Sequence, residues 1–196
     1  MKRITLLLVT VFTFGFVNAQ DREDMSFGVK GGLNISSISN IDDDGINKDP
    51  LIGFHIGFFG EFMISDQFAI QPELLYSTQG VKANFEGEKA DFKLDYINVP
   101  IMAKYYVADA FSLELGPQIG FLVSADAESD GVSVDIKDET KSVDVSLGFG
   151  ASYIFAENFM LGVRYNLGLT QVQEDVFPGD SEWKNSVFQI SVGYKF

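Results

Sequence analysis

The chain has 196 residues, enough for a single domain with a full core, and its formal net charge is −14. That charge argues against a nucleic-acid partner, because an acidic surface has little to offer a phosphate backbone. The chain contains no cysteine, which excludes disulfide bonds and thiolate metal sites. Its 19 glycines and 19 phenylalanines, with few helix-favouring runs, indicate an all-β protein with close backbone packing.

The first segment has the pattern of a secretory signal peptide. Lys2 and Arg3 precede an apolar run, and the residues before Gln20 fit a cleavage site. The run is about 14 residues long, shorter than the ~20 that a helix needs to span a bilayer. We therefore expect export through the Sec pathway and cleavage between Ala19 and Gln20. The predicted organisation is a signal peptide at 1–19, a short periplasmic stub at 20–25 and one domain at 26–196.

Beyond residue 25, apolar and polar residues alternate with a period of two, and no stretch keeps a helical period. In 68–77, for example, Phe68 and Leu74 share one face, whereas Gln71 and Glu73 share the other. The alternating stretches are about 10–14 residues long, which suits a tilted transmembrane strand. Eight stretches are predicted as strands: 27–36, 53–62, 68–77, 94–107, 111–123, 143–155, 159–170 and 185–196.

The connections between these stretches alternate in length. Three are short (64–67, 108–110 and 156–158), and four are long (38–50, 78–91, 124–141 and 171–184). All short connections therefore lie at one end of the strands and all long ones at the other. This is typical of an outer-membrane barrel, in which the short turns are periplasmic and the long loops are extracellular.

Period two alone does not say whether the apolar face touches lipid or encloses a ligand. Three features favour lipid. Glycine is concentrated on the polar face, where a narrow lumen leaves little room for side chains. Aromatic residues gather near the short turns, as in a girdle at a membrane boundary. The charges of the polar face balance, as a sealed interior requires: Lys30, Lys104, Arg164 and Lys195 against Glu61, Glu73, Glu114 and Asp144.

The sequence thus predicts an eight-stranded antiparallel up-and-down transmembrane β-barrel with an ion-pair network in its lumen. If the apolar face pointed inward instead, the chain would form a soluble secreted, lipocalin-like barrel, which stays an alternative. The last strand ends on an aromatic residue, and pairing with the first strand would leave it no free edge. Its outward residues match the terminal signal by which outer-membrane barrels are recognised, so the barrel assembly machinery is an expected partner: Ile190, Val192, Tyr194 and Phe196.

Four segments occur in the order seen in PorT-like outer-membrane β-barrel proteins of Bacteroidota, which are also called a porin family: GVKGGLNIS, IQPELLYSTQG, INVPIMAKYY and FSLELGPQIGFLVSA. The resemblance covers residues 26–196, and the pair QPELLYS and VPIMAKYY carries most of its specificity. It implies the barrel fold and a location in the cell outer membrane. It implies no particular activity, because most members have none assigned.

Eight strands enclose an interior that side chains just fill, whereas an aqueous channel takes about sixteen. Long inward residues such as Phe59, Tyr96 and Arg164 predict a filled polar lumen and no pore for metabolites. A small porin-like transport channel is the alternative. The four long loops are acidic, and we expect them to meet an unknown extracellular ligand or protein. The predicted role is structural or interactive, for a monomeric barrel surrounded by outer-membrane lipid.

No catalytic site or cofactor is predicted. His55 is the single histidine, and a lone lumen histidine is expected to belong to a hydrogen-bond network rather than to act as a base. In one acidic loop, Asp42 and Asp44 are spaced as in a calcium-binding loop, which makes them a weak candidate for a metal site. The position of the strongest ligand, however, holds Leu51 instead of glutamate.

Overall fold

The computed structural model describes residues 25–39, 46–85, 88–129, 131–172 and 183–196. Within these ranges the strands are β1 (Met25–Ser39), β2 (Ile46–Ser65), β3 (Phe68–Phe85), β4 (Glu88–Ala108), β5 (Phe111–Ser129), β6 (Val132–Asp135), β7 (Val143–Phe155), β8 (Phe159–Gln171) and β9 (Lys184–Lys195). A short 3-10 helix, η1, spans Lys137–Glu139. No helix in the described ranges is long and apolar enough to cross a membrane.

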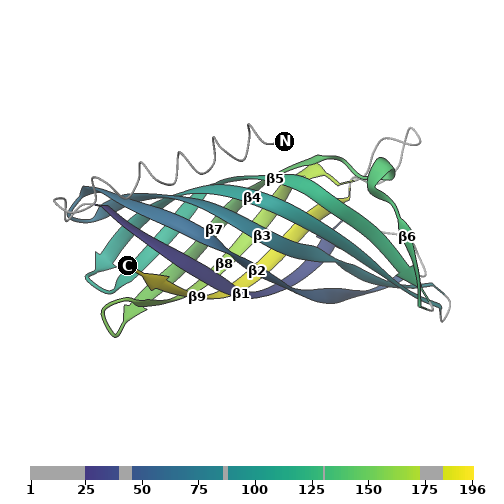
Figure 1. Ribbon diagram of the computed structural model, residues 1–196, viewed down its shortest axis with the longest axis horizontal. Coiled ribbons are helices and arrows are strands. Elements are labelled where there is room, and N and C mark those ends of the chain that lie inside the picture. The colour runs from purple at the N-terminus through teal and green to yellow at the C-terminus, as the bar shows by residue number, and fades with distance from the viewer. Residues whose placement is uncertain (1–24, 40–45, 86–87, 130, 173–182) are drawn as a thin grey trace, which may run out of the picture.

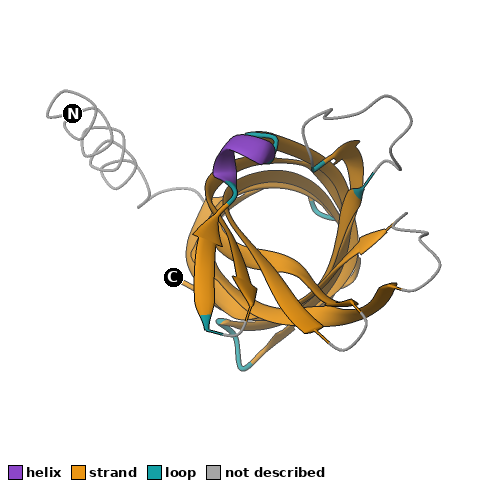
Figure 2. Cartoon of the chain, turned by 90° about the vertical axis from the view of Figure 1, so that its right-hand side faces the viewer, coloured by secondary structure: helices purple, strands orange, loops and turns teal. Residues whose placement is uncertain are grey.

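Eight of these strands close into an antiparallel up-and-down barrel (Figures 1 and 2), which confirms the predicted fold. Successive strands pair with each other, except that β6 is a short addition to β5, and β5 continues the ring by pairing with β7. The ring closes between β1 and β9, from Gly28 opposite Lys195 to Ser39 opposite Lys184. Residues 1–24, which include the predicted signal peptide and most of the stub, lie outside the described part of the chain.

Side chains alternate between an apolar exterior and a polar interior along the half of the barrel next to the short turns. On β5, Leu113 and Leu115 are about half-exposed, whereas Ser112 and Glu114 are buried. The same alternation runs through β7, β8 and β9. An outward apolar band of this kind belongs in hydrocarbon. The arrangement therefore argues against the lipocalin-like alternative, in which the apolar side chains would line the interior.

The strands extend further than predicted at the end opposite the short turns. Most of the stretches expected as long loops at 38–50, 78–91 and 124–141 continue β2, β3, β4 and β5 or form β6 and η1. The alternation persists there with its sense reversed, because Val81 and Leu94 point inward and Lys82 and Lys93 outward. Beyond the membrane the exterior is water, so polar residues take the outer face. These strand segments were not predicted, because only stretches with an apolar outer face were taken as strands.

The inward glycines have a packing reason besides lumen volume. A side chain at Gly32 would overlap the backbone carbonyl of Ile190 on β9, and one at Gly57 would overlap the carbonyl of Leu74 on β3. Glycine at these positions lets the coiled strands approach closely at the inner face of a narrow barrel. The prediction that glycine marks the interior is confirmed, and close strand contact is an additional cause.

We expect Leu147→Arg to destabilise the folded barrel by about 2–4 kcal/mol, the cost of a basic side chain near the bilayer midplane. Leu147 points outward from β7. Urea unfolding in lipid vesicles, followed by gel mobility without boiling, measures the loss. Ser133→Arg on the exposed strand β6 is the matched control and should change the free energy of unfolding by less than about 0.5 kcal/mol. Equal losses in both variants would contradict the assignment of the lipid-facing surface.

Candidate functional site

Four charged side chains meet in the middle of the barrel, and we call them the central ion cluster: Lys30 on β1, Glu73 on β3, Glu114 on β5 and Arg164 on β8. The Lys30 ammonium lies 3.0 Å from Glu73 Oε2. The Arg164 guanidinium reaches Glu73 Oε1 at 2.7 Å and Glu114 Oε1 at 2.6 Å. All four are buried. Because a lone buried charge costs several kcal/mol, their mutual pairing is a condition for the fold.

One ion pair of this cluster crosses the whole lumen. In the closed ring of eight strands, β3 and β8 lie on opposite sides. Arg164 nevertheless donates two hydrogen bonds to Glu73, at 2.7 and 3.0 Å. Two side chains that touch across the full diameter leave no open passage at that level. The central ion cluster therefore spans the interior from one wall to the other.

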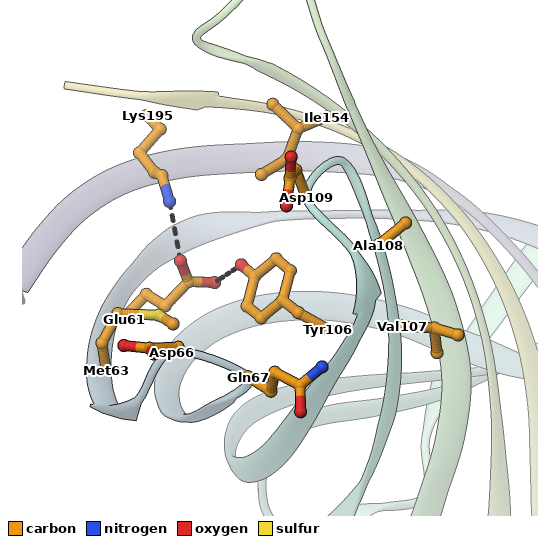
Figure 3. Close-up of a pocket in the computed structure, with 10 residues that line it drawn as sticks. All are labelled: Glu61, Met63, Asp66, Gln67, Tyr106, Val107, Ala108, Asp109, Ile154 and Lys195. Atoms are coloured by element: carbon orange, nitrogen blue, oxygen red, sulfur yellow. Dashed lines mark hydrogen bonds and ion pairs between the residues drawn. The ribbon is translucent and has the colours of Figure 1, made fainter.

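A second group of paired side chains lies nearer the short turns, and we call it the mouth cluster: Glu61, Lys104, Tyr106 and Lys195. Glu61 accepts from Lys104 at 2.7 Å. It also accepts from Tyr106 at 2.8 Å and from Lys195 at 2.7 Å (Figure 3). Lys104 is fully buried, whereas the side chain of Lys195 is 28% exposed. Both oxygens of Glu61 are thus engaged.

A pocket of about 360 Å³ opens beside the mouth cluster. Figure 3 shows Asp66 and Asp109, from two of the short turns, at its edges, with Ile154 on one side. The Glu61 carboxylate borders the pocket but already has three donors. The pocket therefore offers the exposed carboxylates of the turns rather than a free buried acceptor.

His55 sits in a network of neutral polar side chains. Its Nδ1 lies 2.8 Å from Asn34 Oδ1, and its Nε2 lies 2.8 Å from Ser191 Oγ. Asn34 also accepts from Gln189 and donates to Ser77. Both ring nitrogens are therefore occupied by hydrogen-bond partners within the network.

Asp144 stands apart from the two ion clusters. It is buried on the inner face of β7, and its Oδ1 accepts a hydrogen bond from the Thr170 hydroxyl at 2.9 Å. Among the described residues, no lysine or arginine lies within ion-pair distance of it. The structure thus brings together seven of the eight charged residues proposed for the lumen and leaves Asp144 without a basic partner in the described part of the chain.

Two apolar clusters lie in the interior beyond the polar layers, toward the end opposite the short turns. One consists of Leu94, Tyr96, Leu122, Ala125 and Val172, with Ile136 packed against it. The other joins Ile38 and Val81 to Phe92 and Trp183. Leu94, Tyr96 and Leu122 lie in stretches predicted as strands, but the clusters were not predicted because the segments that carry their other members were taken for loops. The reversed period-two pattern in 78–94 was the signal that could have found them.

The remaining sequence-predicted residues fall into two groups. Asp42 and Asp44 lie outside the described residues, within which no cluster of metal-ligating carboxylates and histidine occurs. Ile190, Val192 and Tyr194 point outward from β9. Tyr194 makes edge-to-face contacts with Phe159 and Phe196, with ring centroids 5.0 and 5.7 Å apart. The Phe196 amide donates to the Phe27 carbonyl at 2.8 Å.

Comparisons with known proteins agree with the barrel architecture. Residues 18–174 match the family model described as outer membrane protein beta-barrel domain. The crystal structure of Neisserial surface protein A (NspA) superposes with a TM-score of 0.61 and 17% identity, covering 89% of this chain and 100% of that one. Ail, the attachment invasion locus protein of Yersinia pestis, gives a TM-score of 0.51 and 17% identity over 89% and 100% of the two chains. A search of curated protein sequences finds no match.

We expect Arg164→Met to lower the free energy of unfolding by about 3–5 kcal/mol. In the described part of the chain it removes the only basic contact of Glu114 and one of two for Glu73. Urea unfolding in lipid vesicles measures the change. Lys93→Met, which removes the exposed pair with Glu128, is the control and should cost about 0–1 kcal/mol. The double variant Arg164→Met/Glu114→Gln should recover part of the loss. Similar small losses for both single variants would contradict the bracing role of the central ion cluster.

Proposed function

The chain belongs to the outer membrane protein beta-barrel domain family, and from that premise we propose that it is a closed outer-membrane barrel with a structural or interactive role at the cell surface. In this proposal the lumen is sealed rather than conducting. The part that meets other molecules is the sheet that extends beyond the membrane at the end opposite the short turns.

The observation that carries the proposal is the contact between Arg164 and Glu73 across the full width of the barrel. The mouth cluster supports it on the short-turn side, where Lys104 is fully buried between Glu61 and Gln71. The apolar clusters support it on the other side. Three successive layers of packed side chains are the expected interior of a barrel of only eight strands.

The surface role rests on the extended sheet. Beyond the membrane, β2 to β5 continue side by side, and β6 adds to the outer part of β5 (Figure 1). Every residue of β6 is exposed, including Val132 and Val134. Among the described residues β6 pairs only with β5. Exposed valines on a strand with one unpaired edge are features of a contact surface, because an edge can pair with an extended segment of another protein.

The narrower family assignment and the export route are part of the same proposal. The segments IQPELLYSTQG and INVPIMAKYY support membership of the PorT-like group. Export as a precursor, with cleavage between Ala19 and Gln20, follows from the pattern of the first segment. Assembly through the last strand is supported by the outward row of Ile190, Val192, Tyr194 and Phe196 on and after β9.

A planar-bilayer recording tests the sealed lumen. The purified full-length protein should show no stable conductance of porin size, because the central ion cluster blocks the interior. A sixteen-stranded porin recorded in the same lipid is the positive control. A stable step of comparable size from this protein would refute the sealed lumen and favour the small transport channel instead.

Single-cysteine labelling tests the orientation, since the natural chain has no cysteine. Ser133→Cys on β6 should react with a membrane-impermeant maleimide on intact cells. Asp109→Cys in a short turn should react only after the outer membrane is permeabilised. The same cells test the export route, because the protein recovered from the labelled outer membranes should begin at Gln20. They also test assembly through the last strand, because deletion of Phe196 should abolish surface labelling at Ser133→Cys. The reverse labelling pattern would refute the proposed extracellular sheet.

A further inference from the structure

A row of inward side chains crosses three neighbouring strands around Asp144. Asn98 on β4 lies opposite Gly120 on β5, and Gly120 lies opposite Asp144 on β7. The side chains of Asn98, Tyr96 and Asp144 are the nearest to the space that a side chain at Gly120 would occupy. The absence of a side chain at Gly120 therefore lets these three groups converge on one point of the inner wall.

The charge distribution of the lumen leaves the Asp144 carboxylate uncompensated. Three buried cations pair with three buried carboxylates in the two ion clusters: the cations are Lys30, Lys104 and Arg164. Lys195, the fourth cation, binds Glu61 from the solvent-exposed mouth. Asp144 is only 6% exposed and accepts from the neutral Thr170 hydroxyl. A buried carboxylate in such a place must bind either a proton or a positive charge.

Polar atoms without a partner lie on the same part of the inner wall as this carboxylate. Tyr96 Oη, Asn98 Nδ2 and Gln118 Oε1 are buried and have no hydrogen-bond partner among the described residues. Gln118 donates to Ser146, which is the next inward residue after Asp144 on β7, so its amide lies on the same part of the wall. Buried polar atoms are almost always paired with protein, water or an ion. Three such atoms on the stretch of wall that holds Asp144, which has no basic partner among the described residues, favour an occupant there.

The site lies between the ion pairs and the apolar end of the lumen. Gly150 lies directly opposite Glu114 on β5 and Arg164 on β8 in the strand register. It is further along β7 toward the short turns than Asp144. On the other side, Tyr96 and Leu122 belong to the first apolar cluster. The occupant would therefore be shielded from bulk water at both ends, which strengthens its interaction with the carboxylate.

We propose that Asp144 holds a hydrated monovalent cation of the sodium class in the lumen. One carboxylate balances one positive charge, whereas calcium sites take six to eight oxygens and usually several carboxylates. The Tyr96 hydroxyl and the Gln118 amide oxygen supply neutral oxygen ligands. Water bound to the cation accepts the amide hydrogens of Asn98. This site is independent of the surface role, since it requires only the closed barrel.

The full-length protein, in detergent or in vesicles, is unfolded once in sodium chloride and once in choline chloride at equal ionic strength. The test compares its unfolding in the two salts. Choline is too large for the site, so it reports charge screening alone. Sodium should lower the ratio of unfolded to folded protein in a saturable way, by about tenfold when its concentration is ten times the dissociation constant. In Asp144→Asn the difference between the two salts should disappear.

Two further variants keep the test decisive if Asp144→Asn fails to fold. Tyr96→Phe removes one proposed ligand and keeps the ring, and it should weaken the sodium effect while the barrel still closes. Asp138→Asn removes an exposed carboxylate and should leave the sodium effect unchanged. Equal unfolding of the natural protein in the two salts would overturn the proposal. Stabilisation by calcium but not by sodium would overturn the monovalent assignment.

Discussion

Hydrocarbon offers no hydrogen-bond partner to a backbone amide, so every backbone N–H and C=O inside a bilayer must be paired within the protein. The pairing of β1 with β9 meets this demand for the two strands that would otherwise have free edges. Because the ring closes after eight strands, its interior is narrow. The rest of the molecule follows from that closure: outward side chains meet lipid, and inward side chains meet one another.

The narrow interior determines how this protein uses its charges. Arg164 and Glu73 come from opposite sides of the ring and still form an ion pair. In a wider barrel the same residues would face water, and their pairing would contribute little. Here they lose their hydration, so each needs a partner of opposite charge. The ion clusters meet this need inside the barrel. Asp144 is the lumen carboxylate for which this pairing is not seen among the described residues.

The two halves of the barrel obey the same rule in different solvents. Near the short turns the exterior is lipid, so apolar residues such as Leu113 face outward and Glu114 faces inward. Toward the other end the exterior is water, and the sense reverses, with Leu94 inward and Lys93 outward. The apolar clusters at that end are therefore a small soluble-type core placed on top of a membrane barrel. This core supports the extended sheet beyond the membrane.

The sequence by itself determined the strands, their order, the lipid-facing side and the membership of the charged lumen group. The strands and the faces of the charges are local features, because a period of two can be read within each stretch. The lipid-facing side followed from the placement of glycine, the aromatic residues and the charge balance over all the strands. Tertiary structure alone decided which charges pair: Arg164 and Glu73 are 91 residues apart in the chain, and a balance of four against four cannot reveal that Asp144 lies apart. It also decided where the strands end, since that depends on the change from lipid to water along the barrel axis, which no local pattern records.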